Sequence, residues 1–388
     1  MASDFYSMFT GDSGFINAEV VDDHTLAVNF EEPAGYAMSV LARGSYVVPP
    51  KYYQEVGTDG FSASPVGTGP YQFVEWVKDD HVTFEASTEY WGDTPKLDRI
   101  TWRVIPELPA RVAALEAGEV HLISNVAPGS RDQIRNNSDL ELISAPGLRM
   151  FATFFEMRLD DYPVADAKVR RALNYAVDKQ GLVALFEGDA APLHGQYLTS
   201  AVLGYNPNVD PFHYDPDKAK QLLAEAGYSD GFEMTLKYTI GRYPLDREMG
   251  EAVAGYLEAV GITVEQIPLE IGEFNRQHSE EETMGPAWQW GLLLPADPHR
   301  TLNLFRPETF FARYPDNPKI AELLDAGKAE TDPDKREAIY HELLQIWNDD
   351  PLGIYLIVPN DLYAARTTVL GFEPRVDQVL DLTTVDLE

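Results

Sequence analysis

The chain has 388 residues, of which 44% are hydrophobic, so it can bury more than one core and is globular rather than disordered. Its 63 acidic and 30 basic residues leave a formal net charge of −33, which argues against nucleic acid and anionic lipid as partners. It contains no cysteine, which excludes disulfides, thiol catalysis and cysteine metal sites within this chain. We interpret the excess charge as a solvated surface rather than as a cleft for a cationic ligand.

Strand and turn patterns dominate the first part of the chain. Alternation of apolar and polar residues predicts a hairpin over residues 17–30 and a second hairpin with strands over 71–77 and 81–86, followed by a third strand. A short helix is predicted over residues 36–42. The sequence Tyr90-Trp91-Gly92 predicts a turn that folds two large rings back onto the sheet.

Helices and strands alternate through the remainder of the chain. The aspartate–proline pairs at 215–216 and 332–333 are typical helix starts, an N-cap followed by proline in the first turn. The pattern indicates a mixed α/β fold in which helices cover sheets. It predicts helices over 167–177, 216–226, 246–260 and 334–347, and strands over 149–157, 232–239 and 262–269.

The order of these segments resembles a known family. Three stretches carry the resemblance: SPVGTGPYQFVEWVKDDHVTFEASTEYWGDTPKLDRITWRV at 64–104, DAKVRRALNYAVDK at 166–179 and DPDKAKQLLAEAGYSDG at 215–231. In this order they are similar to the extracellular solute-binding proteins of family 5, the peptide- and nickel-binding components of ABC importers. The resemblance continues through residues 255–264, 288–304 and 346–359 and so covers most of the chain.

The resemblance implies a periplasmic-binding-protein-like α/β fold of type II, with two mixed-sheet lobes joined by a hinge. It implies a first lobe of residues 64–147 with 360–388, a second lobe of 148–359, and a remnant of an extra N-terminal subdomain over 1–63. Family members open with a longer N-terminal part, so we expect the first lobe to be incomplete. Self-association of a natively monomeric protein, or a partner that completes the lobe, is the expected consequence.

The implied function is transport rather than catalysis. A protein of this kind traps a small polar solute (oligopeptide-like, sugar, opine or amine) by hinge closure and delivers it to permease subunits, from the periplasm or the extracellular surface. No apolar run approaches the ~18–20 residues of a transmembrane helix, and residues 1–10 lack signal-peptide features. Two alternatives stay open: a ligand-sensing module of the same fold in a regulator, and, less favoured, a hydrolase of small peptides or sugars.

No catalytic, metal or cofactor motif supports an enzyme. The sequence lacks HExxH spacing, the GxSxG elbow and the GxxxxGK[ST] phosphate loop. The glycine-rich residues 66–70 lead into a strand, so we interpret them as a turn. His299 has no partner at metal-ligand spacing. We therefore expect no cofactor and no metal.

Residues 284–305 hold the leading ligand-site candidates. Trp288 and Trp290 are two apart, so on a strand they share one face and either wall a ligand or fill a core. The resemblance places this segment beside the ligand, and leucine stands where peptide-binding members carry an ammonium-binding aspartate. This departure puts ordinary oligopeptide binding in doubt. Asp297 matches a later family aspartate and is expected to shape a turn or to cap a helix.

Two further pairs are candidates. The resemblance brings Arg43 and Ser45 to a loop that reaches the ligand, where Arg43 either holds a carboxylate or pairs with an acidic side chain. Arg149 and Phe151 lie on the strand that enters the second lobe, and alternation places both, with Phe155, on one face. That face is either site or core.

Overall fold

The computed structural model describes residues 15–44, 46–158, 161–280, 284–294, 297–306 and 317–388. The chain divides into two compact units, Met1–Ala42 with Leu148–Pro359 and Arg43–Gly147 with Asn360–Glu388. We call them unit 1 and unit 2 and describe each by itself. Within the described residues, no helix is both long enough and apolar enough to cross a membrane.

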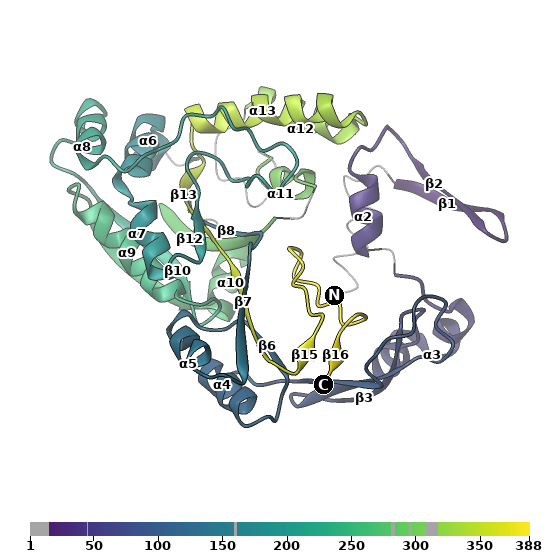
Figure 1. The fold of residues 1–388 in the computed structure, drawn as a ribbon. Coiled ribbons are helices and arrows are strands. Elements are labelled where there is room, and N and C mark those ends of the chain that lie inside the picture. Colours follow the sequence, from purple (N-terminus) through teal and green to yellow (C-terminus); the bar gives the residue numbers. More distant parts are fainter. Residues whose placement is uncertain (1–14, 45, 159–160, 281–283, 295–296, 307–316) are drawn as a thin grey trace. The chain divides into compact units, whose positions relative to one another are not determined.

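Unit 1 is built on a six-stranded mixed sheet (Figure 1). The strand order is β11-β10-β12-β8-β13-β9, with β10, β11 and β12 parallel and with β8 antiparallel to both of its neighbours. Strands β8 and β13 are almost wholly apolar because both of their faces are buried. The strands are β8 (Arg149–Phe155), β9 (Ala190–Pro192), β10 (Glu233–Ile240), β11 (Thr263–Glu270), β12 (Ala287–Leu293) and β13 (Gly353–Pro359).

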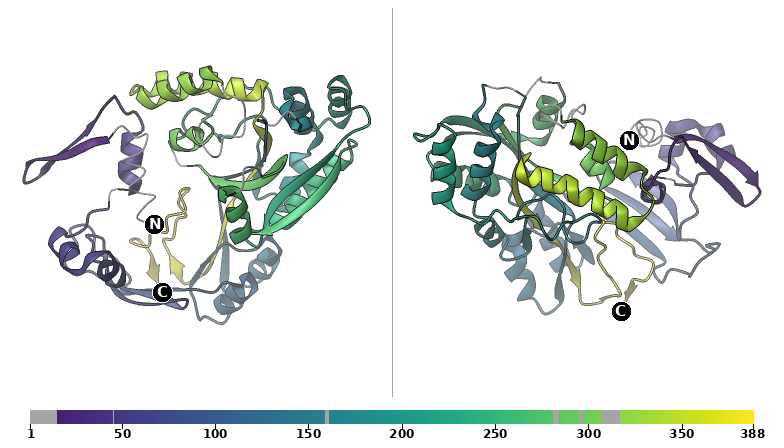
Figure 2. Two further views of the ribbon diagram at one scale, coloured as in Figure 1. Left: turned by 180° about the vertical axis from the view of Figure 1, so that it is seen from behind. Right: turned by 90° about the horizontal axis from the view of Figure 1, so that it is seen from above.

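Helices cover this sheet, and aspartate side chains start several of them. Asp166, Asp215 and Asp332 each accept backbone N–H groups of the first turn, as the sequence predicts for the last two. Helix α9 packs on β10 and β11, and α12 lies beside α13 (Figure 2). The helices are α6 (Ala167–Ala176), α7 (Lys179–Leu185), α8 (Pro216–Glu225), α9 (Asp246–Glu258), α10 (Ile271–Glu280), α11 (His299–Asn303), α12 (Pro318–Ala329) and α13 (Pro333–Asp349), with a 3-10 turn at Pro163–Ala165.

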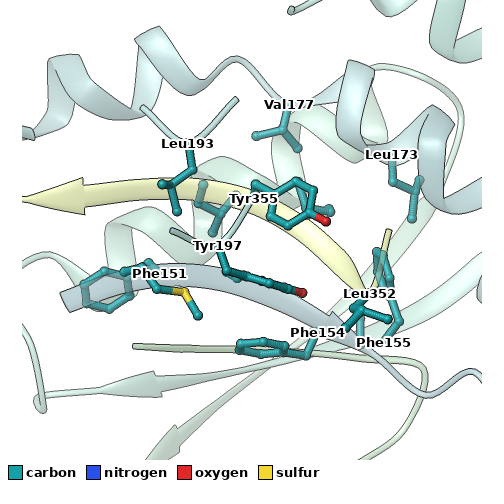
Figure 3. Packing of buried hydrophobic residues seen from close by; sticks show 14 of the residues in the cluster. Phe151, Phe154, Phe155, Leu173, Val177, Leu193, Tyr197, Leu352 and Tyr355 are labelled. Carbon is teal, nitrogen blue, oxygen red and sulfur yellow. The ribbon is translucent and has the colours of Figure 1, made fainter. Parts of the chain in front are cut away.

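Stacked aromatic rings occupy part of the core of unit 1 (Figure 3). The rings of Phe154 and Tyr197 stack with their centroids 5.9 Å apart, and Phe305 stacks on Tyr197 at 4.9 Å. The Tyr355 ring meets Tyr197 edge-on at 4.7 Å. Such contacts add to the area that the rings bury, so this cluster holds β8 and β13 to the helices beside them.

The N-terminal residues of unit 1 form a hairpin and a helix. Strands β1 (Phe15–Asp22) and β2 (Thr25–Phe30) pair with each other, and α2 spans Ala37–Gly44. Before α2, the N–H of Gly35 donates to the carbonyl of Lys328 at 2.9 Å. A Cβ at position 35 would lie 1.9 Å from the Glu330 carbonyl oxygen, so only glycine allows this approach.

Unit 2 contains three small sheets. Strands β3-β4-β5 form one, β6-β14-β7 the second and β15-β16 the third. A smaller core lies under α4, α5 and β14. The strands are β3 (Tyr71–Val77), β4 (His81–Ala86), β5 (Arg99–Arg103), β6 (Leu122–Ser124), β7 (Leu140–Ala145), β14 (Asp361–Arg366), β15 (Val369–Leu370) and β16 (Asp386–Leu387), and the helices are α3 (Pro50–Ala63), α4 (Leu108–Glu116) and α5 (Arg131–Arg135), with a 3-10 turn at Pro128–Ser130.

Most predicted elements are confirmed, and two local predictions fail. The hairpin strands β3 and β4 have the predicted bounds, and the helices and strands given ranges above end within two residues of them. Helix α3 was not predicted, because it buries no residue and Gly57 interrupts it in a left-handed conformation. The prediction that the turn at 90–92 folds both rings back onto the sheet is also wrong: Trp91 is 81% exposed, and its indole N–H donates to the Thr68 carbonyl at 3.2 Å.

The lobe boundaries predicted from the sequence stay a prediction. In the structure the chain passes between the two units after residues 42, 147 and 359. Residues 1–42 and 43–63, which the sequence groups into one remnant, fall in different units.

Candidate functional site

The sequence candidates on β8 and β12 lie on opposite faces of the unit 1 sheet. The register pairs Trp288 with Phe154 and Trp290 with Ala152, whereas Leu293 pairs with Arg149 and Gly291 with Phe151. Residues directly opposite each other share a face, and successive residues alternate. The two tryptophans therefore face away from Arg149 and Phe151, and the four residues do not line one binding surface.

Trp288 is part of the core. Its side chain is 2% exposed, it stacks on Phe154 with centroids 6.2 Å apart, and it meets the His278 ring of α10. Trp290 is only partly buried and packs against Phe274 and His278 of the same helix, at 5.8 and 5.3 Å. Of the two indoles, Trp290 is therefore the one with surface left for a ligand.

Asp297 serves an internal ion pair. Both of its carboxylate oxygens accept from the guanidinium of Arg336 on α13, whose side chain is 4% exposed. Its Oδ1 also accepts the backbone N–H of His299 at 2.9 Å, at the start of α11. Arg336 in turn donates to the Gly327 carbonyl and to the Tyr340 hydroxyl. Asp297 thus accepts a backbone N–H at the start of α11 and joins this segment to α13.

Two candidates lie outside what the structure describes. Ser45 is not among the described residues, and the side chain of Arg43 at the end of α2 is not described. Their ligand contacts stay a prediction.

A cationic cluster lies at one end of the sheet. The guanidinium carbons of Arg149 and Arg242 lie 5.2 and 5.3 Å from the ring centroid of Tyr243. Phe151 meets the same ring edge-on at 5.1 Å, and the Tyr243 hydroxyl donates to the Gly291 carbonyl at 3.2 Å. We call these five residues the arginine edge.

Glycine at position 291 makes this packing possible. A Cβ there would lie 2.9 Å from the Phe151 ring and 3.3 Å from the Tyr243 ring, closer than side-chain carbons normally approach. The two rings therefore lie directly over the β12 backbone, which holds Tyr243 and its flanking guanidiniums near the end of β12.

A buried carboxylate holds the loop that carries Arg242. Asp246, 4% exposed, accepts the backbone N–H groups of Gly241, Arg242, Tyr243 and Arg247 at 2.9 to 3.1 Å. Gly241, with φ of +72°, supplies the left-handed turn after β10. These bonds fix the backbone of the loop, and the Arg242 side chain extends from this fixed backbone.

The position of the arginine edge suits a ligand. Strands β10 and β12 are parallel and end at Ile240 and Leu293, and the antiparallel β8 begins beside them at Arg149. Ligands of open α/β sheets bind outside the carboxyl ends of the parallel strands. No described carboxylate lies within 4.0 Å of the Arg242 guanidinium. Two guanidiniums at such an edge can bind a carboxylate or another planar anion.

The sequence reasoning found Arg149 and Phe151 but missed Arg242 and Tyr243. The available signal was Gly241-Arg242-Tyr243-Pro244, a glycine–proline turn that carries a cation and a ring directly after a predicted strand. The other residues of the arginine edge lie close to this turn only because β10, β12 and β8 are adjacent in the folded sheet.

A different pocket lies within unit 2. It has a volume of about 660 Å³ between β5, β6 and the C-terminal residues 369–387, and apolar side chains dominate its lining. Its arginines are already bound: Arg111 donates to the carbonyls of Ile105 and Ser124, and Arg103 pairs with Glu119 at 3.2 Å. These two guanidiniums are therefore engaged within the protein rather than open to a solute anion.

Within the described ranges, the structure places no three histidine and carboxylate side chains together as a metal site.

Comparison with known proteins agrees with this architecture. The model of the family described as bacterial extracellular solute-binding proteins, family 5 Middle, matches residues 2–311. The chain is 28% identical over 389 residues to the glutathione-binding protein GsiB of Salmonella choleraesuis, covering 95% of this chain and 74% of that protein.

Solved structures share the fold at low identity. The periplasmic binding protein DppA of Helicobacter pylori, in complex with the peptide STSA, has a TM-score of 0.82 and 23% identity over 99% of this chain and 76% of that one. AgaA of A. tumefaciens R10, in complex with agropinic acid, has a TM-score of 0.80 and 24% identity over 98% of this chain and 79% of that one.

Proposed function

Because the chain belongs to the bacterial extracellular solute-binding proteins of family 5, the substrate-binding components of ABC importers, we propose that it captures a solute through a carboxylate held at the arginine edge. Arg149 and Arg242 supply the charge, and Tyr243 keeps the two guanidiniums on one ring. The solute is then delivered to the membrane subunits of a permease. No bond is made or broken in this function.

The observation that carries the proposal is the pair of guanidiniums on a single ring. The chain has 63 acidic residues against 30 basic ones, so cations on its surface normally find carboxylates close by. Arg242 nevertheless has no carboxylate of the described residues within 4.0 Å, although the loop beneath it is held by Asp246. A guanidinium carried on a fixed loop, with no ion pair among the described residues, is available to a ligand anion.

The solute class follows from the same chemistry. Peptides, opines and related amino-acid derivatives all carry carboxylates, and glutathione, a peptide and agropinic acid are named for the similar proteins. We propose a small peptide-like or opine-like acid for this chain. We further propose that it acts outside the cytoplasmic membrane, in the periplasm or at the extracellular surface.

The test compares two arginines that lie five positions apart, Arg242 and Arg247. Solute released by denaturing the purified protein is identified by mass spectrometry, and its affinity is then measured by calorimetry. Arg242→Met should weaken binding by ~10-fold or more, since a charged hydrogen bond contributes ~1.5–3 kcal/mol. Arg247→Met is the matched control, because Arg247 lies in the first turn of α9 beside Glu251.

The outcome decides the role of the edge. Loss of affinity in the first variant alone supports the proposal. Equal affinities of the two variants and the unaltered protein, or a released solute without any acidic group, contradict it.

A further inference from the structure

We propose that Asn136 is a site of N-linked glycosylation, at which an oligosaccharide is attached to the side-chain amide. The acceptor pattern for this modification is asparagine, then any residue except proline, then serine or threonine. Of all the asparagines in the chain, only Asn136 fits the pattern, in Asn136-Asn137-Ser138. A pattern of three residues often occurs by chance, so its placement in the fold decides whether it can be used.

The fold turns this segment outward in unit 2. Asn136 directly follows α5, and Ser138 lies two residues before β7 (Figure 1). Ile134 and Leu140, on either side, are 0% and 7% exposed and belong to the small core of unit 2, whereas Asn136 and Ser138 are exposed. Because the two flanking residues are anchored in the core, the acceptor residues between them are held at the surface.

Among the described residues, the two acceptor side chains have no hydrogen-bond partner. The backbone N–H of Asn136 donates to the Asp132 carbonyl at 3.0 Å, but the amide of Asn136 and the hydroxyl of Ser138 make no such bond. The buried asparagines differ, since the amides of Asn174 and Asn348 each donate to two backbone carbonyls. Modification of Asn136 therefore costs the fold no hydrogen bond that the structure describes.

The backbone of the turn is fixed without these two side chains. The N–H of Asn137 donates to the Ile134 carbonyl at 3.1 Å, and the N–H of Leu140 donates to the Asn137 carbonyl at 3.1 Å. The side-chain oxygen of Asn137 accepts the N–H of Asp139 at 3.0 Å, which is the local bond by which asparagine shapes turns. A sugar on Asn136 would therefore extend from a turn whose shape does not depend on the modified amide.

The reaction needs a co-substrate of one chemical class, a lipid phosphate or pyrophosphate that carries an oligosaccharide. The Nδ2 atom of Asn136 bonds to C1 of the first sugar, the bond between C1 and the phosphate oxygen breaks, and the lipid phosphate leaves with that electron pair. The amide loses one proton, and nothing is oxidised or reduced. Such an acceptor belongs on the surface of an exported protein, which agrees with the location outside the cytoplasmic membrane proposed above.

The test uses the full chain purified from its native host. Mass spectrometry is applied to the intact protein and to the tryptic fragment 136–149, which follows Arg135 and ends at Arg149. The unaltered protein should carry an added mass of sugar residues on this fragment. Asn136→Gln and Ser138→Ala should each lose that mass, whereas Ser138→Thr and Asn137→Gln, which keep the acceptor pattern, should retain it.

The four variants separate N-linked glycosylation from other modifications. An unmodified Asn136 in the protein from the native host overturns the inference, and so does a sugar mass that persists in Asn136→Gln, because the sugar would then be attached elsewhere. Unmodified protein found only in the cytoplasm contradicts the proposed location as well. None of these outcomes bears on the arginine edge, since no solute enters the measurement.

Discussion

At the scale of the residue, the buried side chain of His299 should make the stability of the fold depend on pH. It is 7% exposed, its ring lies 4.8 Å from the ring of Tyr36, and its Nδ1 has no hydrogen-bond partner among the described residues. Burial lowers its pKa to about 4, a shift that Asp297 opposes and that Arg336, Lys328 and Arg306 reinforce. The imidazole is therefore neutral in the folded protein at mildly acidic pH.

The direction of the pH effect follows. Between pH 6.5 and about 4 the unfolded chain binds a proton at this position and the folded chain does not, so stability falls as pH is lowered through that window. The full effect is up to ~3 kcal/mol. His299→Phe should lose this part of the acid destabilisation in urea titrations at several pH values, whereas His24→Phe, on the exposed β1–β2 turn, should keep it. Parallel pH curves for the unaltered protein and His299→Phe would contradict the assignment.

At the scale of the element, β12 places its side chains in two different environments. Trp288 and Trp290 share the face that α10 covers, and Gly291 and Leu293 share the face of the arginine edge. A single strand thus contributes to the core through one face and to the proposed site through the other.

The two tryptophans should respond differently to substitution. Trp288→Ala removes a ring that is 2% exposed and should lower the free energy of unfolding by ~3–5 kcal/mol. Trp290→Ala removes a partly buried ring and should cost less stability. Because Trp290 lies on the face opposite the arginine edge, its loss should leave binding at that edge unchanged. Chemical denaturation and calorimetry on both variants measure these effects, and a larger stability loss for Trp290→Ala would contradict the burial argument.

At the scale of the whole molecule, charge and exposed apolar surface oppose each other. Most of the large hydrophobic side chains that the described residues expose lie between Ile16 and Val104, among them Val20, Trp76 and Trp91 at 79%, 55% and 81% exposure. The net charge of −33 keeps such chains apart through repulsion. Salt screens the repulsion and leaves the apolar surface unchanged.

We therefore expect self-association to increase with salt. Sedimentation velocity in low and in molar potassium chloride should show a monomer at low salt and larger species at high salt. Trp76→Lys, on the exposed part of β3, should reduce the association, and Lys78→Arg in the following turn is the neutral control. A monomer at every salt concentration would show that the exposed side chains do not form a sufficient contact surface.

The sequence by itself determined the local structure and the family. Aspartate caps, proline starts and alternating side chains act between residues a few positions apart, so the hairpin 71–86 and the helices after Asp215 and Asp332 could be read directly. Only the tertiary structure brings together the residues of the proposed site. Arg149 and Arg242 meet on one ring only because β8, β12 and β10 are neighbours in a particular register, and the same register turns Trp288 away from them. Such pairings depend on contacts between distant segments, which no local pattern specifies.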